Sequence, residues 1–140
     1  MRRFAEYAPL RFRSGKYTAV ELRAAVAAHR ISRVVDLRDR DTLLLSPRTY
    51  AAMGVEYVRY PIDESCALPG GVLATVDIPG TLVHCWKGSH RTGAVVATMR
   101  MRDGWAPEAT WAEMQRFGFG RWEEHPALAE SVFGSWRPIC

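Results

Sequence analysis

Residues 84–93 place a cysteine and an arginine at a spacing that suits phosphate chemistry. Five residues separate the two, and a hydroxyl residue and a glycine follow, in the segment His84-Cys85-Trp86-Lys87-Gly88-Ser89-His90-Arg91-Thr92-Gly93. A loop of this length can point its backbone N–H groups at one phosphate, with the sulfur beneath it and the guanidinium beside it. The pattern favours a cysteine-dependent phosphatase.

Cys85 must be a thiolate to attack phosphorus, and three features favour that form. The cysteine opens a loop of converging amides, the loop leads into a helix N-terminus, and Arg91 is a permanent cation. The planar guanidinium of Arg91 can bind two phosphate oxygens at once. The hydroxyl of Thr92 can hydrogen-bond the sulfur as it leaves, and His84 can hydrogen-bond the loop and hold its shape.

Cleavage of a phosphate ester also needs an acid that protonates the leaving oxygen. The segment Pro61-Ile62-Asp63-Glu64-Ser65 follows a predicted strand and offers two carboxyl groups, Asp63 and Glu64. Asp77 is the weaker rival, because it lies near the start of the next predicted strand, at the end away from Cys85. Either Asp63 or Glu64 can serve as the acid.

The surrounding sequence alternates predicted strands with predicted helices. Residues 1–15 are expected to be an irregular lead-in with a short strand at 10–13. Further strands are expected at 31–37, 55–60 and 80–84, and helices at 19–29, 47–53, 72–76, 92–102, 107–116 and 126–133. This order predicts an α/β fold with a central, mostly parallel sheet flanked by helices. Ligands bind such sheets at the carboxyl ends of the strands, where the Cys85 loop would lie.

Length and composition are ordinary for a globular domain. The chain has 140 residues, of which 48% are hydrophobic and 24% are charged, so residues 1–140 are expected to form a single domain. No apolar run is long enough to span a bilayer. The basic start of the chain is not followed by the apolar core of a signal peptide. We therefore expect a cytoplasmic protein.

Charge and cysteine content argue against nucleic-acid binding, a disulfide scaffold and a metal site. The net charge is +4, and 17 of the 19 basic residues are arginine, but no dense basic run interleaved with aromatics indicates nucleic-acid binding. The three cysteines, Cys66, Cys85 and Cys140, are too few for a disulfide scaffold and lack metal-ligand spacing. We expect no metal and no cofactor. Cys66 is expected to be either a semi-buried side chain or a resolving cysteine for Cys85. The five tryptophans are expected to pack in the core and against helices rather than to form a stacking platform.

The chain resembles the cysteine-based protein tyrosine phosphatase superfamily, on its compact, atypical dual-specificity side. Residues 84–93 match the signature HCxxGxxRTG at every fixed position. The segments Phe12-Arg13-Ser14-Gly15, Val34-Val35-Asp36-Leu37-Arg38 and Asp103-Gly104-Trp105 are similar to flanking motifs of small members. The resemblance implies a dual-specificity phosphatase-like fold in which Cys85 is the nucleophile, Arg91 binds phosphate and Thr92 assists dephosphorylation.

The resemblance also implies how phosphate is bound and where the acid lies. The backbone amides of the loop would cradle the phosphate, and they belong to Trp86, Lys87, Gly88, Ser89, His90 and Arg91. Many members carry an aspartate three residues after the proline of the acid loop, where this chain has Glu64, with Asp63 one position earlier.

Several functions are compatible with these residues. The first is a protein phosphatase acting on phosphotyrosine, and also on phosphoserine or phosphothreonine. The second is a phosphatase for inositol phosphates or phosphoinositides, since Lys87 and His90 resemble the basic loop residues of inositol-pyrophosphate phosphatases. A third is a catalytically silent phosphate-binding module, which the intact Cys85, Arg91 and Thr92 disfavour. A fourth is rhodanese or arsenate-reductase chemistry, which also uses a cysteine loop that cradles an anion. The Arg-Thr-Gly ending of the loop argues against this alternative.

Overall fold

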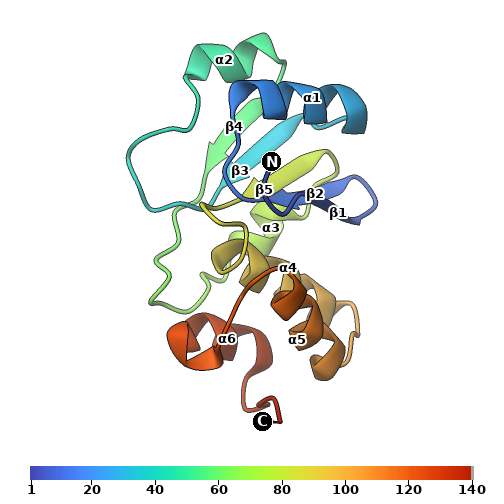
Figure 1. Ribbon diagram of the computed structural model, residues 1–140, viewed down its shortest axis with the longest axis vertical. Helices are drawn as coiled ribbons and strands as arrows, with labels where there is room; N and C mark the ends of the chain where they lie inside the picture. The colour runs from blue at the N-terminus through green and yellow to red at the C-terminus, as the bar shows by residue number, and fades with distance from the viewer. Residues whose placement is uncertain (140) are drawn as a thin grey trace.

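The computed structural model describes residues 1–139, and Cys140 lies outside the described residues. A five-stranded sheet forms its centre (Figure 1), with strand order β1-β2-β5-β3-β4. Strands β2, β5, β3 and β4 run parallel, and β1 pairs antiparallel with β2 at the edge. The strands are β1 (Ala5–Ala8), β2 (Arg11–Ser14), β3 (Arg33–Asp36), β4 (Glu56–Arg59) and β5 (Thr81–His84).

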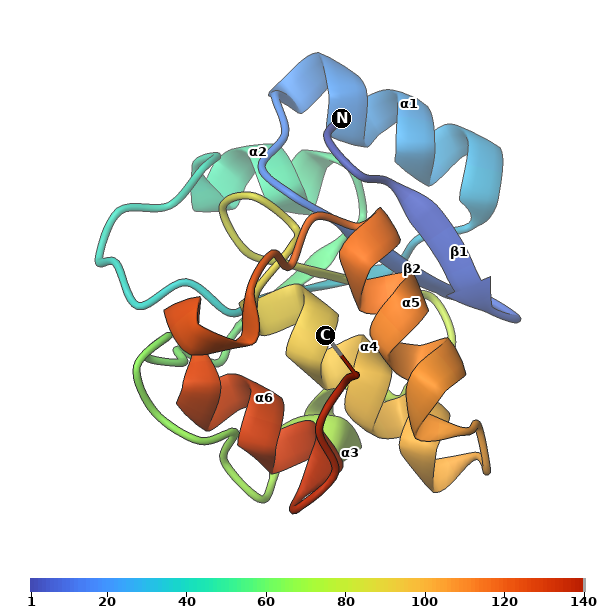
Figure 2. The same cartoon turned by 60° about the horizontal axis from the view of Figure 1, so that its bottom comes forward.

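Helices cover both faces of the sheet. One group of helices lies on one face and a second group on the other (Figures 1 and 2). The first pair is α1 (Ala19–His29) and α2 (Pro47–Ala52). The second group is α3 (Val72–Val76), α4 (Arg91–Arg102), α5 (Pro107–Arg116) and α6 (Pro126–Phe133), with the short 3₁₀ helix η1 (Trp122–Glu124) before α6.

The central strands divide the hydrophobic core into two layers, one on each face. Val34 of β3 lies beside Leu82 of β5, and both pack in the layer under α1 and α2. Their neighbours Val35 and Val83 are also in register and point the other way, into the layer that holds α4 and α6. Both faces of β3 and β5 are therefore apolar, as expected for parallel strands covered on both sides.

The predicted fold class is confirmed, and the expected helices and strands are all present within one or two residues of their ends. Helix α1 begins at the predicted capping box, in which Thr18 accepts from the amide of Glu21 and the Glu21 carboxylate accepts from the amide of Thr18.

The irregular lead-in expected before residue 10 is wrong, because Ala5–Ala8 forms β1. Only Tyr7 of that strand is buried, so its sequence carries no clear alternation, and its pairing with β2 makes it a strand. The short helix η1 was also not predicted.

The cysteines and tryptophans show two further differences. Cys66 and Cys85 are both free, and Cys66 is exposed rather than semi-buried. Trp86 and Trp105 are also exposed, with 45% and 36% of their surface accessible. Trp105 packs against Arg100 of α4, whereas Trp86 is contacted by Lys16, so the expected core or helix packing is wrong for Trp86. Among residues 1–139, no helix has the length and apolar character that crossing a bilayer requires.

Candidate active site

Parallel pairing brings three strand ends to one edge of the sheet. Ser14 at the end of β2 and Asp36 at the end of β3 both lie in register with His84, the last residue of β5. Cys85 follows directly, and the chain then loops through residues 85–90 before α4 begins at Arg91. The order strand, loop, helix matches the prediction and places Cys85 at the carboxyl edge.

A backbone contact between two glycines sets the position of this loop. A Cβ atom on Gly15 would lie 2.7 Å from the carbonyl carbon and oxygen of Lys87. A Cβ atom on Gly88 would lie 2.6 Å from the amide nitrogen of Gly15, and Gly88 has a φ of +77°. Only glycine lets these two segments of the backbone approach this closely. At position 88, only glycine adopts the positive φ angle without strain.

Donors outside the loop hold its carbonyl groups. Arg3 donates to the carbonyl of Lys87 at 3.0 Å, Arg13 to that of Gly88 at 2.9 Å, and the amide of Lys16 to that of Trp86 at 2.8 Å. Within residues 1–139, no backbone carbonyl accepts a hydrogen bond from the loop amides of residues 86–90. The loop therefore keeps a run of N–H donors for an anion.

Arg13 is a buried cation that supports the loop from below. Its side chain is 1% exposed, and its guanidinium lies 3.8 Å from the ring centroid of Phe117. Burial lowers the pKa of Arg13 to about 10, against the opposing attraction of Glu113. The guanidinium is thus charged at neutral pH and adds positive potential beneath the loop of residues 85–90.

His84 is fully buried and links the loop to the opposite layer. Its Nδ1 lies 3.3 Å from the carbonyl oxygen of Cys85 and its Nε2 lies 3.1 Å from the hydroxyl of Tyr17, which in turn lies 2.8 Å from the hydroxyl of Tyr50. A carbonyl only accepts, so Nδ1 carries the proton and Nε2 accepts from Tyr17. Burial lowers the pKa of His84 to about 4, which keeps the ring neutral and fixes this tautomer.

Asp36 and Arg38 form a second buried unit beside His84. Arg38 donates to both carboxylate oxygens of Asp36, and the hydroxyl of Tyr57 donates to the same carboxylate at 2.6 Å. Burial alone would raise the pKa of Asp36, but the hydrogen bonds from Arg38 and Tyr57 outweigh it and lower the pKa. This unit fixes the start of the loop that carries Asp39.

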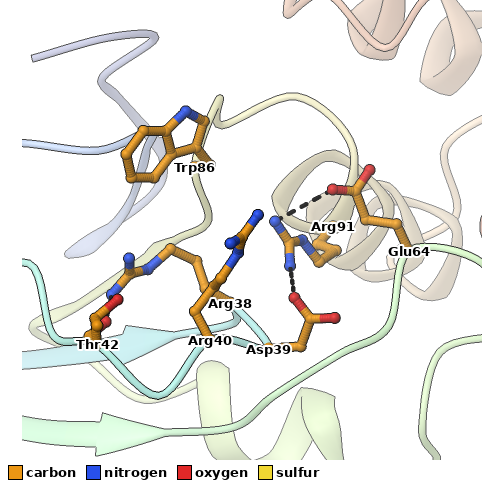
Figure 3. A pocket seen from close by; sticks show the side chains of 7 residues that line it. All are labelled: Arg38, Asp39, Arg40, Thr42, Glu64, Trp86 and Arg91. Carbon is orange, nitrogen blue, oxygen red and sulfur yellow. Dashed lines mark hydrogen bonds and ion pairs between the residues drawn. The ribbon is translucent and has the colours of Figure 1, made fainter.

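Arg91 points into the site between two carboxylates (Figure 3). Its Nη1 lies 3.0 Å from Oδ1 of Asp39 and 3.4 Å from the carbonyl oxygen of Ile62, and its Nη2 lies 3.2 Å from Oε1 of Glu64. The side chain is only 7% exposed, and its Nε is buried without a partner among the described residues. A bound oxyanion can satisfy that nitrogen.

Two neighbouring cavities share Glu64, Trp86 and Arg91. One has a volume of about 400 Å³ and is shown in Figure 3; its other lining residues are Arg38, Asp39, Arg40 and Thr42. The second has a volume of about 220 Å³; its other lining residues are Cys85, Lys87, His90, Glu124 and His125. The cysteine and the arginine predicted to act together thus border the same cavity.

The structure distinguishes the two candidate acids. Glu64 points at Arg91, whereas Asp63 turns back to its own loop and accepts from the amide and hydroxyl of Ser65 at 2.9 and 2.7 Å. These bonds lower the pKa of the exposed Asp63. Asp77 pairs with Arg11 and Arg102 and borders neither cavity. Of the two carboxyl groups predicted on this loop, Glu64 is the one that the fold brings to Arg91, where it joins Asp39.

The other predicted residues take less uniform positions. Thr92 is buried next to Arg91 at the start of α4, and its hydroxyl has no partner among residues 1–139, as is also true of Ser89. His90 turns from the loop toward His125, with ring centroids 3.9 Å apart. Burial and the neighbouring His125 lower the pKa of His90, against the attraction of Glu64.

Sequence reasoning missed several residues of the site. Asp39 and His125 lie in polar segments far from Cys85 along the chain, and the fold places them against Arg91 and Glu64. Tyr17 carried no signal beyond its place before the capping box. Arg13 enters the sequence analysis only through the resemblance, because nothing local distinguishes a buried arginine from the partly exposed Arg11 of the same strand.

Solved structures confirm the fold. The core catalytic domain of the PP-IP phosphatase Siw14 from S. cerevisiae superposes with a TM-score of 0.78 and 16% identity, over 94% of this chain and 86% of the other. TpbA from P. aeruginosa gives 0.73 and 23%, over 94% and 84%, and Tk-PTP gives 0.71 and 21%, over 94% and 97%. No family profile and no curated protein sequence matches the chain.

The close backbone contact at Gly15 predicts that adding a methyl group at this position destabilises the protein. Gly15→Ala should lower the free energy of unfolding by about 1–3 kcal/mol, because the Cβ atom meets backbone rather than a movable side chain. Gly70→Ala is the matched control, since nothing lies within 4 Å of a Cβ atom there. Urea unfolding of both variants tests this, and equal stabilities would contradict the close contact.

The buried His84 predicts a pH-dependent loss of stability. Its pKa is about 4 in the folded protein and about 6.5 in an unfolded chain, so the unfolded state binds more protons between these values. Stability therefore falls as the pH drops through this window, by about 2 kcal/mol from this group between about pH 7.5 and about pH 5. In His84→Gln the pH dependence of urea unfolding should shrink by that amount; an unchanged slope would show that His84 is not buried as a neutral ring.

Proposed function

We propose that the protein is a phosphatase that hydrolyses phosphomonoesters through a phosphocysteine intermediate. The observation that carries this is the loop itself. Among residues 1–139, its amides at residues 86–90 have no backbone acceptor and the buried Nε of Arg91 has no partner, and Cys85 borders the same cavity. Convergent donors with a nucleophile at their base are what phosphoryl transfer requires.

In the first step the thiolate of Cys85 attacks phosphorus and forms the S–P bond, while the P–O bond to the leaving group breaks. Glu64 donates its proton to the departing oxygen. Arg91 and the loop amides stabilise the charge on the three equatorial oxygens of the transition state. The phosphate competes with Glu64 for Arg91, and its negative charge favours the protonated carboxyl that this step needs.

In the second step water attacks the phosphocysteine and the S–P bond breaks. The carboxylate of Glu64 takes a proton from that water, and inorganic phosphate leaves. The hydroxyl of Thr92, which is buried and has no partner in the described part of the chain, can then donate a hydrogen bond to the returning thiolate. The proposed reaction uses no metal or cofactor.

Two substrate classes fit the site. Phosphorylated protein is the first, and the similar TpbA has been solved in complex with pTyr. An inositol phosphate or phosphoinositide is the second, and the similar Siw14 is a PP-IP phosphatase. The cavity of about 400 Å³ beside Arg91 supports the inositol phosphate class. Arg40 also lines this cavity and adds positive charge that a second phosphate group of the substrate could use.

Replacement of the nucleophile tests the proposed function. Cys85→Ser should lower turnover of p-nitrophenyl phosphate by about a thousandfold or more, because the hydroxyl is not ionised at neutral pH. Cys66→Ser is the control and should keep its activity, since Cys66 is exposed and borders neither cavity. Absence of turnover by the wild-type protein on phosphopeptides and inositol phosphates, with phosphate still bound, would replace the enzyme with a binding module.

The acid is tested by a matched pair of variants. Glu64→Gln should lower kcat on an alkyl phosphate by roughly 10²–10⁴-fold, the usual contribution of a general acid. The loss should be smaller on p-nitrophenyl phosphate, whose phenolate leaves readily without a proton. Asp63→Asn should change kcat little. The reverse order of the two variants would assign the acid to Asp63.

A further inference from the structure

Three side chains from separate parts of the chain meet at one edge of the smaller cavity. Glu64 belongs to the loop after β4, His90 to the phosphate loop, and His125 to the connection between η1 and α6. Nδ1 of His90 and Nδ1 of His125 approach the same oxygen, Oε2 of Glu64, at 3.6 and 3.5 Å. One ligand atom of each residue lies within 4.8 Å of the other two.

These distances suit metal ligands better than hydrogen bonds. Both exceed the range of about 2.7–3.2 Å in which nitrogen and oxygen share a proton well. Two ligands that each bind Zn²⁺ at about 2.0–2.1 Å in a tetrahedron lie about 3.4 Å apart. The two contacts of Glu64 Oε2 are close to that separation.

The surroundings hold the three side chains close together, and the neighbouring rings of His90 and His125, with centroids 3.9 Å apart, must separate slightly when both nitrogens bind one tetrahedral ion. The other oxygen of Glu64, Oε1, is held by Arg91, so the carboxylate presents Oε2 alone. The rings of His90 and His125 both pack edge-on against Phe119, with centroids 5.6 and 5.9 Å away. Such outer contacts orient ligands in natural metal sites.

We propose that Glu64, His90 and His125 form a binding site for a divalent transition metal ion, with Zn²⁺ as the best match. Two imidazoles and one carboxylate favour such an ion over Mg²⁺ or Ca²⁺, which take mainly oxygen ligands. The fourth position of a tetrahedral ion would face the cavity that Cys85 and Arg91 also line. All three ligands are partly exposed, which leaves a path for the ion.

The expectation of no metal rested on spacing along the sequence. His90 and His125 are 125 − 90 = 35 residues apart, and Glu64 lies a further 90 − 64 = 26 residues upstream. No local motif links them. The fold supplies the proximity, because the loop that carries Glu64 packs against α6, where the amide of Leu68 donates to the hydroxyl of Ser131 at 2.8 Å.

An ion at this site would suppress turnover, and this consequence rests on the proposed function. Glu64 is the acid of the proposed reaction, and a carboxylate bound to Zn²⁺ cannot deliver a proton to the leaving group. Metal occupancy would also fill space beside Cys85 and the phosphate position. The binding of the ion itself does not depend on whether the protein is a phosphatase.

The test measures Zn²⁺ binding in a protein that lacks the reactive thiolate. Cys85→Ser removes the other strong zinc ligand of this cavity, and titration against a chromophoric chelator then reports the affinity of the remaining site. His125→Ala and His90→Ala are added to this background, with His29→Ala in α1 as the matched histidine control. Circular dichroism checks that each variant folds. If an alanine variant does not fold, asparagine at the same position, as in His125→Asn, replaces it.

The expected result is one Zn²⁺ per chain in Cys85→Ser and in the His29→Ala control. His125→Ala and His90→Ala should each weaken binding by about 100-fold or more, since loss of even an outer partner costs about 10- to 100-fold. No zinc binding by Cys85→Ser, or equal binding by the His125→Ala and His29→Ala proteins, would overturn the proposal.

A separate measurement addresses turnover. With Cys85 intact, the ratio of activity in Zn²⁺ to activity in chelator is compared within each variant. This ratio should be low for the wild-type protein and closer to one for His125→Ala. Equal inhibition of both proteins would assign the zinc effect to Cys85 and overturn the link to Glu64. If the wild-type protein shows no turnover at all, the proposed function fails while the binding measurement still decides the metal site.

Discussion

The backbone contact between Gly15 and Gly88 is the constraint on which the rest of the site depends. It presses the end of β2 against the loop after β5 at a distance that no side chain permits. The loop carbonyls are then within reach of Arg3, Arg13 and the amide of Lys16, and the loop amides are left for an anion. A single steric condition thus decides which way the peptide groups of the loop face.

Buried polar groups beneath the loop keep this arrangement in place. Burial of an ion or a polar ring is costly unless each group finds a partner. Here Arg13 bonds a loop carbonyl, Asp36 is bonded by Arg38, and His84 connects Tyr17 to the carbonyl of Cys85. Four buried polar atoms have no partner among the described residues, namely Nε of Arg13, Nε of Arg91 and the hydroxyls of Ser89 and Thr92. Of these residues, Arg91 borders both cavities, whereas the hydroxyl of Ser89 faces Gly118.

Glu64 takes part in all three activities that we propose for this site, which are phosphate binding beside Arg91, acid catalysis and metal binding. Its Oε1 pairs with Arg91, its Oε2 faces His90 and His125, and the residue borders both cavities. A phosphate would compete for Arg91, and a metal ion would compete for the carboxylate. Acid catalysis and metal binding therefore exclude each other at one side chain, because a carboxylate cannot donate a proton while it coordinates an ion.

The sequence by itself determined the strand, loop and helix order around Cys85 and nearly all helix and strand positions, since spacing, capping and apolar periodicity are local signals. It left Asp63 and Glu64 equivalent, because neighbouring residues differ only in the direction of their side chains. The tertiary structure turned Glu64 toward Arg91, brought Asp39 to the same guanidinium and placed His125 beside His90. It also made Ala5–Ala8 a strand through pairing. These features depend on the path of distant segments, which no local pattern encodes.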